Sequence, residues 1–92
     1  MSTDGNTPIR CWIYRSGKKN EMYLYLDEEG GFERVPETLM NMFGAPALVM
    51  ELELHPQRPL ARENVLQVMD NLRSTGFHLQ MPPTVVPEML HS

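Results

Sequence analysis

Residues 11–27, CWIYRSGKKNEMYLYLD, decide the fold of this 92-residue chain. Two short segments rich in Ile, Leu, Tyr and Trp, 11–15 and 22–27, flank the polar, glycine-containing stretch SGKKN at 16–20. This arrangement is typical of a β-hairpin. Side chains alternate between the two faces of a strand, and neither face of this hairpin is clearly polar. We therefore expect the hairpin to lie inside a sheet that is covered on both faces.

One register of the hairpin places Tyr14 opposite Tyr23, and therefore Trp12 opposite Tyr25. Residues directly opposite each other on antiparallel strands share a face. In this register the four aromatic rings lie on one face of the sheet. The other face then carries Cys11, Ile13, Leu24 and Leu26.

The middle of the chain predicts a short helix and then a strand. The helix begins at VPE, residues 35–37, because proline suits the first helical turn and a glutamate suits the positive N-terminal end. Gly44 is well placed to end it. Residues 47–54, ALVMELEL, form the clearest strand, which alternation predicts to carry Leu48, Met50, Leu52 and Leu54 on one face. The opposite face changes from Val49 to Glu51 and Glu53, so that end of the strand is expected to be solvated.

The last third predicts a longer helix and a fourth strand. Apolar residues recur at helical spacing from about residue 62 to residue 75, although no N-cap is obvious, and Gly76 closes the helix. Residues 77–81, FHLQM, alternate as a strand, which the prolines that follow bring to an end. We expect residues 1–9 to be a flexible lead-in and residues 84–92 a tail or a short helix. The predicted order is β-β-α-β-α-β, a single α+β domain over residues 10–83.

Several of these strings, in this order and spacing, resemble the YcgL family of small bacterial proteins. They are CWIYRS at 11–16, KK at 18–19, YLY at 23–25, VPE at 35–37, FG at 43–44 and GFHLQMPP at 76–83. The resemblance implies a three-layer α/β/α sandwich, with a mostly antiparallel four-stranded sheet between helices. It implies no activity, cofactor or catalytic set, so no functional residue follows from it.

The composition is that of an ordinary globular protein, with 41% hydrophobic and 22% charged residues. There is no apolar run near the roughly 20 residues that cross a bilayer. The N-terminus is polar and lacks the features of a secretory signal. Cys11 is the only cysteine, so an internal disulfide is excluded. We therefore expect a cytoplasmic protein.

The net charge of −4 is unevenly distributed. Residues 1–20 hold four basic residues against one acidic residue, whereas residues 21–92 hold four against eleven. A mostly acidic body argues against generic coating of nucleic acid, which depends on many phosphate contacts. A local contact with an anion is still compatible with the basic corner.

That corner is the candidate contact site, with Arg15, Lys18 and Lys19 crowded into the hairpin turn. Cations that track phosphates beside rings that stack on bases are typical of proteins that bind single-stranded nucleic acid. This function requires the hairpin aromatics to be exposed. The alternative, which we favour, is that the rings belong to the core and the lysines keep an exposed turn solvated.

Other chemistry has little support in the sequence. SGKK at 16–19 is followed by a strand rather than a helix, so it is not a phosphate-binding loop. His55, His78 and His91 lie in different elements without metal-ligand spacing. Glu51 and Glu53 share a strand face, but such a pair is usually a solvated surface. We predict no catalytic, cofactor-binding or metal-binding residues. A weak enzyme is the third hypothesis, and a surface cleft joining Glu51, His78 and Cys11 would support it.

We therefore predict a non-catalytic protein-binding or adaptor domain. The candidate surfaces are the hairpin edge, a methionine-rich surface and the proline-bounded tail PPTVVP at 82–87. Methionine suits a surface that adapts to a partner, and the residues in question are Met42, Met81 and Met89. The alternative is binding of RNA or single-stranded DNA through Arg15, Lys18 and Lys19.

Overall fold

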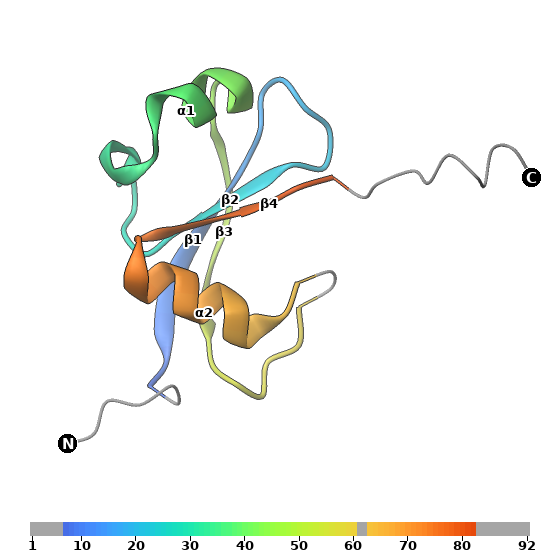
Figure 1. Cartoon of the computed structure of the whole chain (residues 1–92). Helices are drawn as coiled ribbons and strands as arrows, with labels where there is room; N and C mark the ends of the chain where they lie inside the picture. Colours follow the sequence, from blue (N-terminus) through green and yellow to red (C-terminus); the bar gives the residue numbers. More distant parts are fainter. Residues whose placement is uncertain (1–6, 61–62, 83–92) are drawn as a thin grey trace, which may run out of the picture.

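The computed structural model describes residues 7–60 and 63–82. Its elements in chain order are β1 (Ile9–Arg15), β2 (Tyr23–Leu26), the 3-10 turn η1 (Phe32–Arg34), α1 (Glu37–Phe43), β3 (Ala47–Leu54), α2 (Val65–Ser74) and β4 (Phe77–Gln80). The strands form one antiparallel sheet in the order β3-β1-β2-β4 (Figure 1). The predicted α+β class and the order of strands and helices are confirmed, and the hairpin forms the two central strands.

The sheet separates two cores, one under each helix. Figure 1 shows α1 and α2 on opposite sides of β2 and β4. The core against α2 consists of Cys11, Ile13, Tyr25, Leu54, Val68, Met69 and Leu72. The core against α1 consists of Tyr14, Met22, Leu24, Leu26, Val35 and Phe43. The hairpin therefore contributes to both cores, as its two apolar faces predict.

The hairpin register differs from the expected one by a single residue. Trp12 lies opposite Leu26, and Tyr14 lies opposite Leu24. Each β1 residue pairs with a β2 residue one position further from the turn than expected, which makes the turn one residue longer. The Ser16 backbone N–H closes it by donating to the Met22 carbonyl at 3.0 Å. Since a one-residue slip moves side chains to the other face, the prediction that four aromatic rings share one face is wrong. The α1 side carries Trp12 and Tyr14, and the α2 side carries Tyr23 and Tyr25.

Strand β3 is interrupted by a bulge that alternation alone does not predict. Met50 lies opposite Ile13, whereas Leu48 lies opposite Tyr14, so the register shifts by one residue between these pairs. Leu48 therefore faces the α1 side of the sheet and Met50 the α2 side. The prediction that Leu48 shares a face with Met50 is wrong, because the extra residue of a bulge reverses the alternation beyond it.

The helix starts also differ from the predicted ones. Helix α2 begins at Val65, and its N-cap is Asn64, whose side chain accepts hydrogen bonds from the backbone N–H groups of Leu66 and Gln67 at 2.9 and 3.1 Å. The predicted start near residue 62 placed this cap inside the helix. Pro36 is the N-cap residue of α1 rather than part of its first turn.

The predicted termini are only partly described. Strand β1 begins at Ile9, so this residue of the predicted lead-in belongs to the sheet. Residues 1–6 and the predicted tail at 84–92 lie outside the described residues. Within residues 7–60 and 63–82, no helix is long and apolar enough to cross a membrane. A cytoplasmic location stays a prediction.

The capping of α2 gives a test of this geometry. Replacement Asn64→Ala removes the acceptor for two helix N–H groups, and we expect it to lower the free energy of unfolding by about 1 kcal/mol. Asn64→Asp keeps an acceptor at the same place and is expected to cost much less. Urea unfolding followed by circular dichroism measures both, and equal losses for the two variants would contradict the cap.

Candidate functional site

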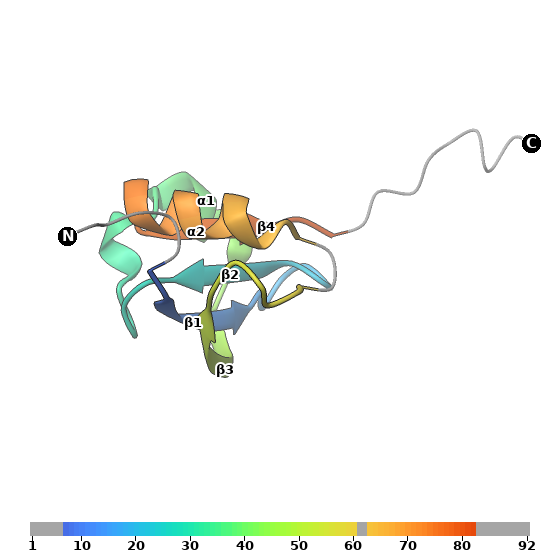
Figure 2. The same cartoon turned by 90° about the horizontal axis from the view of Figure 1, so that it is seen from below.

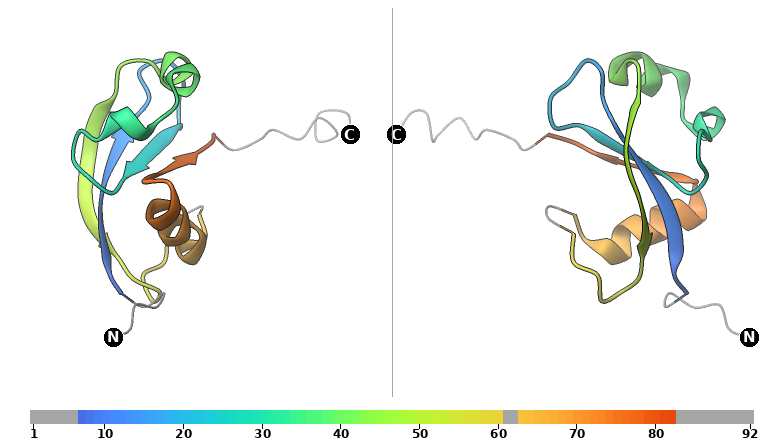
Figure 3. Two further views of the ribbon diagram at one scale, coloured as in Figure 1. Left: turned by 60° about the vertical axis from the view of Figure 1, so that its left-hand side comes forward. Right: turned by 180° about the vertical axis from the view of Figure 1, so that it is seen from behind.

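The outer strand β3 carries three consecutive exposed apolar residues. Leu48, Val49 and Met50 are 50%, 48% and 48% exposed. Figure 2 shows β3 on the side of the molecule away from both helices. Figure 3 shows it at the outer edge of the sheet, with no other described element beyond it. Such an edge presents backbone N–H and C=O groups that are free to pair with another strand.

One end of β3 is anchored and the other is not. Leu54 is fully buried in the core against α2, and Leu52 packs against the same core. Beyond Leu52, toward the start of the strand, β3 packs chiefly against β1. Strand β3, although six of its eight residues are apolar, is thus the least buried strand, because it lies at the edge where neither helix covers it.

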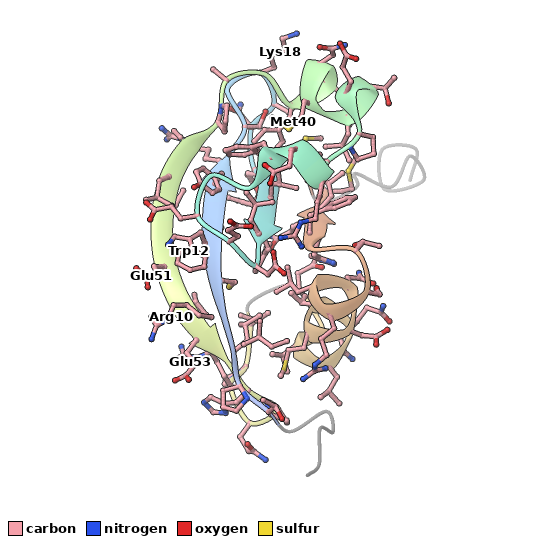
Figure 4. All side chains as sticks on the ribbon, turned by 90° about the vertical axis from the view of Figure 1, so that its left-hand side faces the viewer. Arg10, Trp12, Lys18, Met40, Glu51 and Glu53 are labelled. Atoms are coloured by element: carbon pink, nitrogen blue, oxygen red, sulfur yellow. The ribbon has the colours of Figure 1, made fainter. Side chains whose placement is uncertain are left out.

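The anchored end of β3 is acidic on its α1 side. Glu51 lies opposite Trp12 and Glu53 lies opposite Arg10. The Arg10 guanidinium Nη1 is 2.7 Å from Glu51 Oε2 in an exposed ion pair. Figure 4 shows Arg10, Trp12, Glu51 and Glu53 along this part of the sheet. The solvated acidic face that the sequence predicts is confirmed.

The other end of β3 adjoins the basic turn at residues 15–19. Arg15 lies opposite Ala47, the first residue of the strand. Gly17 lies so close to the chain before β3 that a Cβ there would be 2.6 Å from the Ala45 carbonyl oxygen. Strand β3 therefore runs from a basic end, across an apolar centre, to an acidic end.

The three basic residues predicted as a contact site differ in their surroundings. The Lys18 ammonium donates a hydrogen bond to the Asn41 carbonyl at 2.8 Å, near the C-terminal end of α1. Arg15 and Lys19 are exposed, and neither forms an ion pair with another described residue. Lysine at a helix C-terminus stabilises the helix, so Lys18 has a structural role beside any contact function.

The aromatic residues near this turn do not form an exposed platform. Tyr14 and Tyr25 are buried in different cores. Trp12 packs against the α1 core and Tyr23 against the α2 core, both partly buried. The interpretation of these rings as core residues is supported.

The buried polar residues have structural partners. The His78 ring Nε2 is 2.6 Å from Glu63 Oε1, and its Nδ1 is 2.9 Å from the Asn71 amide nitrogen. The Tyr25 hydroxyl donates to Gln80 Oε1 at 2.9 Å. Both nitrogens of His78 are thus engaged. No pattern in the sequence indicates Glu63 as its partner, since the two residues meet only through the docking of α2.

The residues of a hypothetical enzyme cleft do not meet. Glu51 lies on the α1 side of the sheet, whereas Cys11 and His78 lie on the α2 side. Cys11 is fully buried, and burial raises the pKa of its thiol to about 11. Among the residues that the structure describes, no group of His, Cys, Asp and Glu is arranged to hold a metal ion.

The buried thiol makes a direct prediction. At pH 8 we expect Cys11 to react with a thiol reagent at least about 100-fold more slowly than a free cysteine, because thiolate is the reactive form and is rare at this pKa. In denaturing urea the reaction should become fast. Since the thiol of the unfolded chain ionises first, stability should also fall as pH rises from about 9 toward 11. Rapid labelling of the native protein would contradict the burial.

The comparison with known proteins covers nearly the whole fold. The sequence profile of the YcgL domain matches residues 11–83. This chain belongs to the YcgL family. A YcgL domain-containing protein of Pseudomonas putida strain W619 is 55% identical over 73 residues, which cover 79% of this chain and 75% of the relative. Relatives from Pseudomonas paraeruginosa strain PA7 and Pseudomonas aeruginosa strain UCBPP-PA14 have the same identity and coverage. The resemblance found in the sequence is confirmed, and the YcgL match includes all of β3.

Sequence reasoning missed β3 as the exposed edge of the YcgL domain. The available signal was the run Leu48, Val49 and Met50, which is apolar on both faces of the strand, followed by glutamates. Such a run is equally typical of a covered central strand. Only the strand order decides between the two, and the local pattern does not determine that order.

Proposed function

We propose that this YcgL domain is a non-catalytic protein-binding domain, and that it pairs the outer edge of β3 with an extended strand of another polypeptide. The observation that carries the proposal is the half-exposed run Leu48, Val49 and Met50 on an edge strand. In strand addition, backbone hydrogen bonds supply affinity and alternate side chains supply specificity. Both are available at β3.

The protection of this edge is incomplete. Natural edge strands are usually guarded by charges, prolines, bulges or a covering element. Strand β3 has glutamates at one end, Pro46 just before it and a bulge near its centre. These features leave the apolar centre open while limiting the registers in which a second strand can pair. That combination favours a specific partner over indiscriminate aggregation.

The other surfaces predicted from the sequence contribute less to this proposal. Met22 and Met69 are fully buried, so part of the methionine content fills the cores. Met42 and Met81 are exposed, but on separate elements, α1 and the segment after β4. Met89 and the tail at 84–92 lie outside the described residues.

Photo-crosslinking tests the proposed edge. A photoreactive amino acid replaces Val49 on β3 or, as a control, Leu66 on α2, whose exposure of 54% is similar. We expect a defined polypeptide adduct from position 49 and little from position 66, because position 49 lies on an edge strand and position 66 lies on a helix. Mass spectrometry identifies the adduct. Hydrogen exchange on the reconstituted complex should then show protection of the β3 backbone amides.

The control at position 66 makes the cross-linking result at position 49 decisive. Equal cross-linking at positions 49 and 66 would indicate that exposed apolar side chains alone cause capture. No adduct at position 49 would remove β3 as the binding edge. Protection confined to other elements in the reconstituted complex would also contradict the proposal.

Nucleic-acid binding at the basic turn is the competing function. The side chains of Arg15 and Lys19 are exposed and form no ion pair within the described part of the chain, which favours an anion contact, whereas the packed rings offer little stacking surface. If this function is correct, fluorescence anisotropy with single-stranded RNA or DNA will show binding that weakens steeply with salt. Lys19→Glu should abolish it and Lys19→Gln should weaken it less. Lys19 is chosen because Lys18 also contacts α1. No binding at low salt would remove this function.

A further inference from the structure

We infer that the strand paired with β3 is β3 of a second copy of this chain, joined antiparallel about a two-fold axis. This inference rests on the proposed function and names its partner. The two sheets then form one continuous sheet of two domains. A two-fold interface uses the same surface twice, so the surface must be complementary to itself. Strand β3 meets that requirement in charge, in side-chain facing and in the position of its apolar centre.

The charges along β3 are arranged for antiparallel self-pairing. Figure 4 shows Lys18 beyond one end of the strand, and Glu51 and Glu53 toward the other end. Arg15 adjoins the basic end through its pairing with Ala47. An antiparallel pair brings opposite ends of identical strands together, so each acidic end lies beside the basic turn of the other copy. Opposite charges across strands are favourable, and like charges are not.

The facing of the side chains agrees with a pairing centred between Val49 and Met50. Residues directly opposite each other must point to the same face of the joined sheet. This register places Leu48 opposite Glu51 of the second copy, and both lie on the α1 side. It also places Ala47 opposite Leu52 of the second copy, and both lie on the α2 side. The bulge produces this agreement, because it moves Leu48 to the α1 side.

The next pair in the same register strengthens the charge match. Glu53 lies opposite Pro46 of the second copy. The basic turn of that copy is bound to the segment just before Pro46. That turn is held there because the backbone N–H groups of Gly17 and Lys18 donate to the Phe43 carbonyl at 3.1 and 3.3 Å. Glu53 thus lies next to the basic turn of the second copy. The Glu53 carboxylate is exposed and forms no ion pair with another described residue, so it is available to contact that turn.

Alternative self-pairing registers are less favourable. A pairing centred on Glu51 places this residue opposite its own copy, and one centred on Leu52 places Glu51 opposite Glu53. Both registers confront glutamates directly. The first also places Leu48 opposite Leu54, which lies on the other side of the sheet, and the second places Leu48 beyond the end of the partner strand. A pairing centred on Met50 separates the glutamates but places Leu48 opposite Leu52, which lies on the other side of the sheet. Of these registers, only the one centred between Val49 and Met50 separates the glutamates and keeps opposite residues on one face. The pattern of the strand therefore selects the register as well as the partner.

The size of the interface sets the expected affinity. Pairing one strand from each copy buries less than the roughly 1,200 Å² of total surface that stable complexes reach, so the dimer belongs to the weak, reversible class. We expect a monomer–dimer equilibrium over protein concentrations of about 10 µM to 1 mM. The dimer should weaken moderately as salt increases, because its end contacts are exposed ion pairs.

Two substitutions at one position test partner and register together. Leu48→Glu and Leu48→Lys both replace an exposed apolar side chain by a charged one. The glutamate would face Glu51 of the second copy, whereas the lysine would face it with opposite charge. Because each contact occurs twice in the dimer, we expect the dissociation constant to rise about tenfold or more for Leu48→Glu relative to Leu48→Lys. Leu66→Glu on α2 serves as a control and should match the unsubstituted protein.

Sedimentation velocity at several concentrations gives the dissociation constants, and circular dichroism confirms that each variant is folded. A monomer at every concentration would overturn the self-pairing. So would equal weakening by Leu48→Glu and Leu48→Lys, since an unspecific apolar contact predicts equality. The proposed function fails separately. If the chain is monomeric but position 49 still cross-links a different polypeptide, the edge binds another partner. If position 49 cross-links nothing, the proposed function falls as well.

Discussion

The closure of the β1–β2 turn at Ser16 determines most of the geometry of this domain. The Ser16 backbone pairs with Met22, and its hydroxyl donates to the Phe43 carbonyl at 2.5 Å. The same hydroxyl oxygen accepts hydrogen bonds from the N–H groups of Lys18 and Lys19. Ser16 thus pairs with the second strand of the hairpin through its backbone, and its side chain binds the turn to the end of α1. Since register decides the face of every side chain, it also decides which residues enter each core.

Much of the fold could be predicted because it depends on local patterns. The strand at 47–54 was predicted with the boundaries it has, and a turn flanked by apolar segments was sufficient to identify the hairpin. Glycine at the end of α2 was also predicted correctly, and Gly76 has a φ of +89°, where a glycine is favoured. These features require only neighbouring residues. The family assignment agrees with them over residues 11–83.

The features that could not be predicted depend on contacts between distant segments. The observed hairpin register accompanies a contact between Ser16 and Phe43, 27 residues apart, and the bulge in β3 is defined by its pairing with β1. The candidate binding edge was missed for the same kind of reason. Apolar residues at 48–50 indicate burial until the strand order places them at the rim of the sheet. The basic residues were identified, but their separate roles depend on the position of α1 above the turn.

The sharing of one hairpin between two cores has a consequence for how the domain unfolds. Cys11 and Ile13 of β1 pack under α2, while Tyr14 of the same strand packs under α1. If either helix detaches from the sheet, it exposes side chains of β1, a strand against which the other helix also packs. Domains that lack such sharing open in separate parts. Here the loss of one core removes the support of the other, so the domain should melt as one cooperative unit. The exposed edge of β3 therefore exists only while the whole domain is folded.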